Sequence, residues 1–431
     1  MSKSKQPIST STFMDTLVKG NPLVTAIEER ALSEDELKHK ITVRCDNNVG
    51  FDKWGCSQME VGLDTDFFIS PPHAYTLYSR IRQLMMMGYV KRHPASYDYD
   101  KYIHLADLRK TPAPKKLKGS GKSIFIRGRS GEGKTTLLDS LLDTFETVIE
   151  HQPSPLTGGR KIRQVSWVKV DMSKGASRKA FYLDVIQEID KVLDTSFASK
   201  IPSRDLEGER LLYMIKVCRM ACLGVLVIDD VQWALSGTAA NANQKITNEF
   251  LEQLFNQLGI PLVFIGTPEA EKLKGFAEQT GRRLAHNGSI EINSDLVTST
   301  FWRDMVKTMF VSFLGMDSRH INDDFYHIVH YYTEGNASRL KTIVGNLLRR
   351  EMTGCITAEY IHEAYSQEKG AFEKLKTPFV ELSSSAGKKL NTKSNKPSPK
   401  ASPDRTEPES ITEDEEDFED IFIIKGETYG Q

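Results

Sequence analysis

Short apolar runs alternate with stretches of helical periodicity through the middle of the chain. Five runs have the length and composition of strands, and they read SIFIR, VSWVKV, VLVID, PLVFIG and SIEI. Between the first two, apolar residues repeat with a helical period at Leu137, Leu138, Leu141, Leu142, Phe145 and Val148. Between the second and third they do so at Phe181, Val185, Ile186, Ile189 and Leu193. Strands that alternate with helices predict an α/β fold with a five-stranded parallel sheet, covered on both faces.

The pattern changes on both sides of this α/β region. From residue 294 to 372 the strand runs stop, and four amphipathic stretches predict a small helical domain. Before residue 116, polar segments surround one clear helical stretch, AYTLYSRIRQLMMMGYV. Beyond residue 372 a segment rich in Ser, Lys and Pro has too little apolar surface to offset the entropy of ordering. We therefore predict four regions, an N-terminal extension (1–115), an α/β domain (116–293), a helical lid (294–372) and a disordered tail (373–431).

The near-neutral charge of this 431-residue chain hides an asymmetry. The formal net charge is −1, but residues 401–431 contain 11 acidic and two basic residues, a net charge of −9. The first 400 residues therefore carry +8, which permits contact with nucleic acid without establishing it.

Nothing in the composition indicates secretion or a membrane span. No apolar run approaches the roughly 20 residues that a transmembrane helix needs, and the start of the chain lacks the apolar core of a signal peptide. The five cysteines form no CxxC pair, which is typical of a reduced, cytoplasmic protein. We expect Cys218 and Cys222 to be buried structural thiols.

The strongest chemical signal is the segment GRSGEGKT, residues 128–135. It fits the complete G-x-x-x-x-G-K-[ST] pattern, follows the first predicted strand and opens a predicted helix. Its glycines let backbone N–H groups turn toward phosphate oxygens, and the helix N-terminus adds its positive end. We expect Lys134 to reach the β- and γ-phosphates of ATP and Thr135 to coordinate Mg²⁺. The predicted nucleotide-binding residues are Gly128, Ser130, Gly131, Glu132, Gly133, Lys134, Thr135 and Thr136.

Two carboxylates end the third predicted strand. Asp229 is placed to hold the same Mg²⁺ as Thr135, and Asp230 to polarise an attacking water molecule. The alternative for Asp230 is a solvated acid at a strand end. In many nucleotide hydrolases this position is glutamate, one methylene longer, and a misplacement of about 1 Å can cost on the order of 10²-fold in rate. The sequence therefore predicts slow hydrolysis.

Further polar residues are candidates for the same site. Thr267 follows the fourth strand and can orient the γ-phosphate or the attacking water, or simply cap the strand. Arg282 and Arg283 precede the fifth strand and can project into the nucleotide site of a neighbouring subunit, or form an exposed basic turn. Arg339 begins a helix of the lid and can reach back to the phosphates, or be an ordinary surface arginine.

A basic loop after the second strand is the leading candidate for DNA contact. The segment DMSKGASRKAF offers Lys174, Ser177, Arg178 and Lys179, whose charges and donors suit phosphate contacts that do not read sequence. The alternative is a solvated helix start capped by Ser173 or Ser177. The segment GGRKIRQ, with Lys161 and Arg163, is a second basic candidate.

Taken together, the P-loop, the strand-end acids, Thr267, the tandem arginines and Arg339 resemble the pattern of an AAA+ ATPase. Within that class the sequence most resembles the TnsC/TniB-type regulators of bacterial transposons. The residues that carry this resemblance are GRSGEGKTTLL, VLVIDDVQ, FIGTPEAEKL with GRRL, TEGNASRLKTIVGNLL, and YSRIRQLMMMGYVKRHP in the N-terminal extension. The similarity spans about residues 75 to 370.

The resemblance implies a switch that works on DNA. In that family the ATP form assembles as rings or filaments on duplex DNA and licenses the transposase, and hydrolysis dismantles the assembly. Carried over to this chain, Thr267 and Arg339 take the two sensor positions, and Arg282 or Arg283 the arginine finger. The implied partners are duplex DNA, further copies of this chain, a transposase with its accessory nuclease, and a target-selection protein, in the bacterial cytoplasm.

The acidic tail adds a possible docking element. Its last part, ITEDEEDFEDIFIIKGETYG, combines acids with an apolar cluster that a purely solvating tail has little use for. We expect it to bind a basic partner, for which the resemblance favours the transposase or the nuclease. A tail that only aids solubility or covers the protein's own DNA surface is the alternative.

Other functions remain open at the level of sequence. A replication initiator or helicase loader would share the ATPase core, but usually carries a winged-helix DNA reader after the lid. A P-loop signalling scaffold would bind nucleotide without DNA and usually appends repeats, which we do not find in the sequence. A small-molecule kinase would need a second substrate pocket, which the sequence does not indicate.

Overall fold

The computed structural model describes residues 20–43, 51–65, 67–95, 122–172, 177–202, 206–235, 250, 254, 257–268 and 288–367. The chain divides into two units, Met1–Leu375 and Lys376–Gln431, and every described residue belongs to the first. The predicted disordered tail therefore lies outside the described residues.

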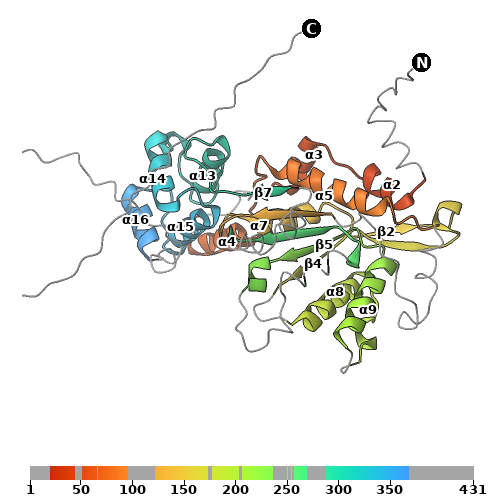
Figure 1. The fold of residues 1–431 in the computed structure, drawn as a ribbon. Coiled ribbons are helices and arrows are strands. Elements are labelled where there is room, and N and C mark those ends of the chain that lie inside the picture. Colours follow the sequence, from red (N-terminus) through yellow and green to blue (C-terminus); the bar gives the residue numbers. More distant parts are fainter. Residues whose placement is uncertain are drawn as a thin grey trace, which may run out of the picture. The chain divides into compact units, whose positions relative to one another are not determined.

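Five parallel strands form the central sheet (Figure 1). Their spatial order is β4 (Trp167–Asp171), β5 (Val225–Asp229), β6 (Leu262–Gly266), β1 (Ser123–Arg127) and β7 (Ser289–Glu291). Successive side chains of a strand point to opposite faces, and in β5 Leu226 and Ile228 join one apolar core while Val225 and Val227 join another. Both faces of the sheet are thus buried, which confirms the predicted α/β fold with five parallel strands.

Helices cover the two faces as two separate layers. On one face lie α8 (Arg178–Leu193) and α9 (Glu207–Met220). On the other lie α2 (Pro22–Glu29), α3 (Glu34–Ile41), α5 (Ala74–Tyr89) and α7 (Lys134–Leu142). The N-terminal extension therefore supplies three helices of the sheet's cover, although its sequence indicated only α5.

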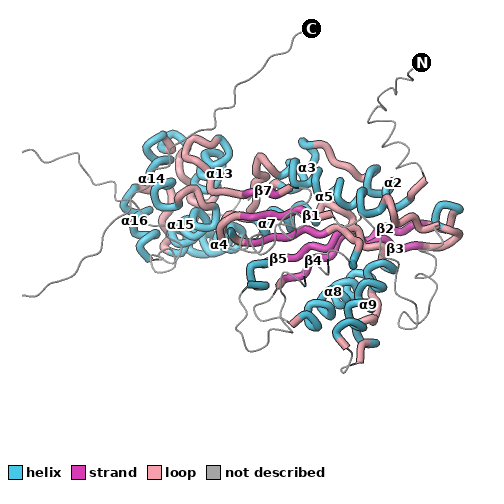
Figure 2. The backbone as a smooth tube through the Cα atoms, in the orientation of Figure 1, coloured by secondary structure: helices cyan, strands magenta, loops and turns pink. Residues whose placement is uncertain are grey.

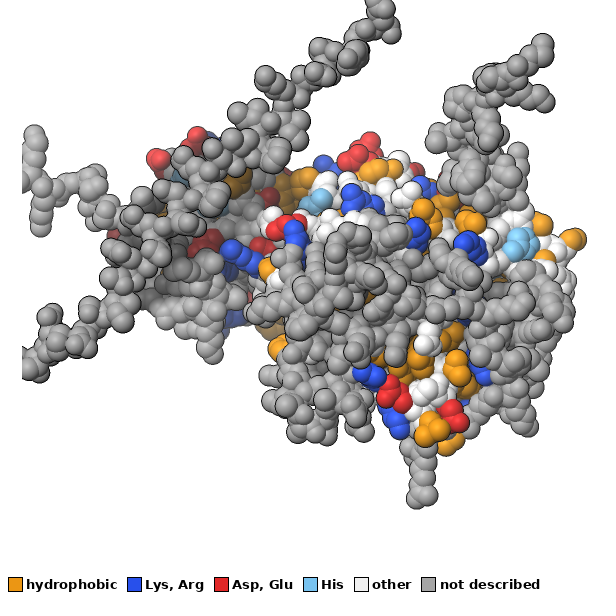
Figure 3. Space-filling model, viewed as in Figure 1, with side chains coloured by type: hydrophobic (Ala, Val, Ile, Leu, Met, Phe, Trp, Pro, Cys, Tyr) orange, Lys and Arg blue, Asp and Glu red, His pale blue; other side chains and the backbone are white. Residues whose placement is uncertain are grey.

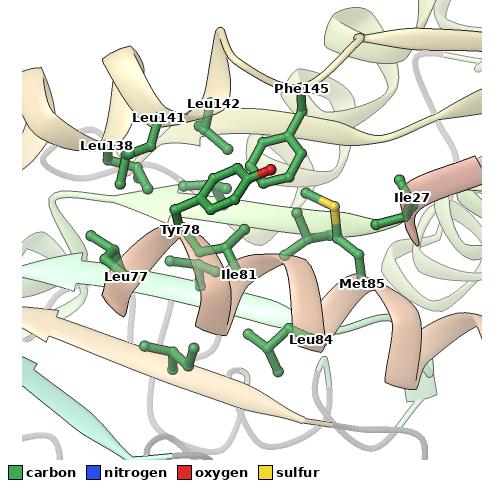
Figure 4. Close-up of a cluster of buried hydrophobic side chains, with 14 of the residues drawn as sticks. Ile27, Leu77, Tyr78, Ile81, Leu84, Met85, Leu138, Leu141, Leu142 and Phe145 are labelled. Carbon is green, nitrogen blue, oxygen red and sulfur yellow. The ribbon is translucent and has the colours of Figure 1, made fainter. Parts of the chain in front are cut away.

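Helix α5 is held to the α/β core by close apolar packing (Figure 4). Tyr78 stacks on Phe145 with ring centroids 5.0 Å apart, and Leu77 and Ile81 belong to the same cluster of buried side chains as the leucines of α7. At the far end of the helix the buried Tyr89 hydroxyl donates to the carbonyl oxygen of Cys222 at 2.8 Å. The ring stack near the start of the helix and this buried hydrogen bond at its end both hold α5 to the core.

The helical region after the sheet includes one helix from the N-terminal extension. Its members are α13 (Thr300–Ser312), α14 (Asp323–Thr333), α15 (Ala337–Arg349) and α16 (Ala358–Gln367), and all four were predicted. Helix α4 (Lys53–Thr65) buries Cys56, Met59 and Leu63 in the same core. The extension therefore contacts both the sheet and the lid.

Two sequence predictions about secondary structure were wrong. The helical period was expected to continue to Val148, but α7 ends at Leu142, and Val148 instead begins β2 (Val148–His151). The run VSWVKV was expected as one strand, but it is divided at Ser166 between β3 (Ile162–Val165) and β4 (Figure 2). Strand β3 pairs antiparallel with β2 as a separate sheet. This pairing is set by partners distant in sequence, which local periodicity does not reveal.

The structure also tests the prediction made for two cysteines. Cys218 and Cys222 are both buried, as predicted, and burial raises the pKa of the Cys218 thiol to about 12. None of the helices that the structure describes is long and apolar enough to cross a membrane.

Candidate nucleotide-binding site

Residues 128–133 form the turn between β1 and α7, and Lys134 and Thr135 begin the helix, as the sequence predicted. Gly131 and Gly133 have φ angles of +82° and +78°, in the left-handed region that residues with a Cβ rarely adopt. Gly133 is the N-cap of α7, so the backbone N–H groups at the start of this helix lie in the loop. Such a helix start without side-chain caps is an anion-binding arrangement.

Lys134 is almost completely buried within this loop. Its Nζ atom donates a hydrogen bond of 2.6 Å to the carbonyl oxygen of Arg129. Burial lowers the pKa of this amine, and the nearby carboxylates of Glu132, Asp229 and Asp230 oppose that effect. The Lys134 amine therefore lies against the loop, in the position where its positive charge can contact a bound phosphate group.

Thr135, in the first turn of α7, and Asp229, at the end of β5, lie next to each other. The Thr135 hydroxyl donates to the Asp229 carboxylate at 3.0 Å, and Asp229 is 3% exposed. Hard oxygen donors of this kind are the ligands that Mg²⁺ prefers, and it usually binds through one or two protein groups together with phosphate oxygens. The described residues therefore fit a nucleotide with Mg²⁺.

A lysine that the sequence reasoning missed lies beside this pair. The Nζ atom of Lys169, on β4, is 2.7 Å from the Asp139 carboxylate and 3.5 Å from that of Asp229. Burial lowers its pKa, but Asp139, Asp229 and Asp171 outweigh burial and the pKa is raised. Lys169 thus stays charged and balances the buried Asp229. The sequence around Lys169 shows only a polar residue within a strand. Its role becomes visible once the strand order places β4 beside β5, which carries Asp229.

Asp230 and Thr267 meet at the same edge of the sheet through a third residue. The side-chain amide of Gln232 donates to the Asp230 carboxylate at 2.8 Å and accepts from the Thr267 backbone N–H at 3.2 Å. The Thr267 hydroxyl is buried, without a hydrogen-bond partner among the described residues. The sequence VIDDVQ contains Gln232, but no role was assigned to it.

The backbone at Asp230 gives a reason for aspartate at this position. Its φ angle is +54°, in the left-handed region, where aspartate and asparagine are several-fold enriched among residues other than glycine. The Asp230 N–H donates to the Asp229 carboxylate at 2.8 Å, which fixes this turn. The shorter acid therefore suits the backbone that the strand end requires.

The lid contacts the first half of the P-loop directly. The Asn336 side chain donates to the carbonyl oxygen of Ser130 at 3.2 Å, and the Ser338 N–H donates to that of Gly131 at 3.1 Å. A Cβ atom on Gly131 would lie 2.9 Å from the Asn336 side chain, so only glycine allows this approach. Glu132 completes the contact by accepting from the Arg129 N–H at 2.6 Å and from Ser294, which follows β7.

Arg339 lies one residue beyond the Ser338 contact and is buried. Its guanidinium is 2.8 Å from the Glu334 carboxylate. The structure thus places Arg339 on the helix that contacts the P-loop, with an acid as one of its partners. Arg282 and Arg283 lie outside the described residues.

The basic loop after β4 is described only from Ser177 onward, so Lys174 lies outside the described residues. Ser177 caps α8 by accepting from the Ala180 N–H at 3.2 Å, as the alternative interpretation expected. Arg178 pairs with Glu207 at 3.2 Å and lies over the ring of Phe250. Arg178 therefore has a packing role between helices, whereas Lys179 is half-buried.

The second basic segment lies at the other end of the strands. Strand β3 ends at Val165, whose backbone bonds to Ala221 and Gly224, just before β4 and β5 begin. Lys161 pairs with Glu150, and Arg163 donates to the carbonyl oxygen of Leu193. On the face drawn in Figure 3, the described Lys and Arg side chains are interspersed with acidic and apolar ones.

Residues 117–273 match a protein family described as an AAA domain. With the observed strand order, this match identifies the fold as the α/β AAA+ P-loop fold. An AAA domain implies nucleotide binding. A search of curated proteins gives no match.

Several solved structures are similar to this chain at low sequence identity. The ORC2 protein of Aeropyrum pernix, in ADPNP and ADP complexes, is 12% identical over 57% of this chain and 62% of that chain, with a TM-score of 0.37. A Walker-type ATPase of Pyrococcus abyssi is 14% identical over 59% and 70%, with a TM-score of 0.38. Domain III of the replication initiation protein DnaA of Thermotoga maritima is 15% identical over 70% and 94%, with a TM-score of 0.37. The match thus spans less than two thirds of the first of these chains.

Proposed function

We propose that this protein is an ATP-dependent regulator of transposition that assembles on duplex DNA and is released by slow ATP hydrolysis. The observation that carries the nucleotide part is the 3.0 Å contact between Thr135 and Asp229 beside the left-handed glycines of the P-loop. The DNA and transposition parts are supported by the sequence resemblance to TnsC/TniB-type regulators.

The residues of the site divide into binding and hydrolytic roles. The backbone N–H groups from Glu132 to Thr136 and the Lys134 amine bind the phosphates, and Thr135 and Asp229 hold Mg²⁺. The ion supplies positive charge that neutralises the phosphate oxygens. Asp230 accepts a proton from the attacking water, and the Thr267 hydroxyl, which has no hydrogen-bond partner among the described residues, orients that water or the γ-phosphate.

The lid and a neighbouring subunit complete the site in this proposal. Asn336 and Ser338 tie the lid to the P-loop, so Arg339 can exchange its Glu334 partner for the γ-phosphate. Arg282 or Arg283 reaches the nucleotide of the next subunit and neutralises charge in the transition state. In this proposal the lid arginine and the arginine of the neighbouring subunit both contact the bound ATP. Assembly of the subunits therefore depends on the nucleotide.

The partners follow from the same proposal. Duplex DNA is contacted through phosphates, and the assembled chains present a surface to a target-selection protein. The acidic, apolar tail docks the transposase or its accessory nuclease, because acids steer it to a basic partner and apolar residues supply burial.

The proposal is tested by measuring ATP turnover with and without duplex DNA, alongside electron microscopy with ATP, ADP and a non-hydrolysable analogue. We expect DNA to stimulate turnover, and rings or filaments to form with ATP or the analogue but not with ADP. ATP binding that is indifferent to DNA in every measurement would favour the signalling scaffold instead.

DNA affinity should be independent of sequence and should weaken with salt. Each phosphate that is neutralised contributes about −0.9 to the slope of log affinity against log salt concentration. Replacing Lys174 and Lys179 together by alanine should make this slope shallower by about 2 in fluorescence anisotropy titrations with duplex DNA. Arg178 is left in place because it pairs with Glu207.

The matched control replaces Lys161 and Arg163, which lie at the amino-terminal end of the strands. The variant that lacks both residues should show the parental slope of log affinity against log salt concentration. A shallower slope in the control, with none in the test variant, would move the DNA contact to the β2–β3 sheet.

A further inference from the structure

Gln232 joins two strand ends that face the phosphate site. It follows β5 in the short helix η3 (Val231–Leu235), and its amide bonds to the Asp230 carboxylate and to the backbone of Thr267, beyond β6. The two bonds measure 2.8 Å and 3.2 Å. One side chain therefore spans the proposed water-activating acid and the proposed γ-phosphate sensor.

The chemistry of the three groups fixes the orientation of this amide. An ionised carboxylate can only accept a hydrogen bond, and a backbone N–H can only donate one. The Gln232 NH₂ group must therefore face Asp230 and its oxygen must face Thr267. Glutamate offers no donor to Asp230 when ionised, and asparagine is one methylene shorter, so glutamine matches both ends.

The hydrogen bonds of the Asp230 backbone do not by themselves fix the orientation of its carboxylate. Asp230 adopts a φ angle of +54°, held by its own N–H to Asp229 and by the Trp233 N–H to its carbonyl oxygen. These bonds fix the main chain but leave χ1 of the side chain free. The amide of Gln232 is the side-chain donor that the structure shows on this carboxylate.

The backbone and the side chain of Thr267 are in different states. Its backbone N–H is engaged by Gln232, while its buried hydroxyl is without a partner among the described residues. A buried hydroxyl without a partner is uncommon and calls for an explanation. Gln232 thus anchors the strand end and leaves the hydroxyl available to a ligand.

We propose that Gln232 is a positioning residue that aims the Asp230 carboxylate and couples it to Thr267. The inference rests on the proposed function, since it concerns the same hydrolytic site. Gln232 holds the short acid in one orientation, so the water-activating group and the γ-phosphate sensor keep a constant separation during hydrolysis. Loss of the amide frees both groups without removing either one.

The first test replaces Gln232 with methionine, which keeps the length and removes both hydrogen bonds. We expect kcat for ATP in the presence of duplex DNA to fall by roughly 10- to 10²-fold, with KM changed by less than about 3-fold. The matched control is Gln187→Met, the same change at an exposed glutamine of α8, which should leave both constants unchanged. A KM effect without a kcat effect would contradict the proposal.

The second test replaces Gln232 with glutamic acid and measures kcat under the conditions of the first test. An ionised Glu side chain keeps the length of glutamine but offers no hydrogen-bond donor to Asp230. It also places a second negative charge beside the Asp230 carboxylate, and the two charges repel each other.

We therefore expect turnover of Gln232→Glu to fall at least as far as that of Gln232→Met. Turnover at the parental rate, in a variant that melts at the parental temperature, would overturn the proposal.

A third readout separates this inference from the proposed function. If the parental protein hydrolyses no ATP, the proposed function fails, and the hydrogen bonds are then judged by nuclear magnetic resonance. Asp230→Asn should shift the Gln232 side-chain amide resonances, and Gln232→Met should shift the Thr267 amide resonance. Unshifted resonances would reject the positioning role whatever the outcome for hydrolysis.

Discussion

Replacing Asp230 with asparagine should reduce ATP turnover by about 10²- to 10⁴-fold while ATP binding is retained. In the proposed function the Asp230 carboxylate accepts a proton from the attacking water, and an amide of the same size cannot accept it. The P-loop and Asp229 are untouched, so nucleotide affinity should stay within a few-fold of the parental value. Because ATP then persists, assemblies on duplex DNA should live longer. Turnover and the lifetime of DNA-bound assemblies are the quantities to measure.

Two comparisons make this result specific. Lys134→Ala removes the buried amine that is proposed to bind the phosphates, and should abolish ATP binding and DNA assembly together. Asp143→Asn is the same change at an exposed acid after α7 and should have no effect. An Asp230→Asn protein that hydrolyses ATP at the parental rate would show that another group activates the water.

Removing the arginine finger should have an effect of similar or larger size. If Arg282 or Arg283 projects into the next subunit's site, its replacement by alanine should lower turnover of the homo-oligomer by on the order of 10³-fold. ATP binding should persist, because the P-loop of each chain is intact. Turnover, measured separately for the two variants, identifies which arginine acts.

Mixing two inactive variants tests whether the arginine acts between subunits. Asp230→Asn retains both arginines, and the finger variant retains Asp230. In a head-to-tail assembly, random mixing in equal amounts creates a complete site at about one quarter of the interfaces. Turnover should therefore recover in the mixture. If turnover does not recover with either arginine variant, these residues have a structural role instead. The control is Arg319→Ala, at an exposed lid arginine paired with Asp317, which should leave turnover unchanged.

The central fold was accessible from sequence because its signals are local. The central strands β5, β6 and β1 are apolar runs buried on both faces, and helices α8, α13, α14 and α15 carry their own periodicity. Helix α4 was not predicted, because the residues that it buries pack against lid helices more than 200 positions away. The β2–β3 sheet was missed for the same reason, since register between strands is not written in either strand alone.

The sequence by itself determined the P-loop, the strand-end acids and their meeting at one edge of the sheet. Glycines, a lysine and a threonine at fixed spacing bind phosphate through local backbone geometry, and parallel strands bring their carboxyl ends together. Tertiary structure alone decided which side chains support them: Lys169 beside Asp229, Glu132 on Ser294, and Gln232 between Asp230 and Thr267. It also decided that Arg178 pairs with Glu207 on a neighbouring helix. These contacts depend on strand order and helix packing, and a polar residue shows no preference for them in its own neighbourhood of the chain.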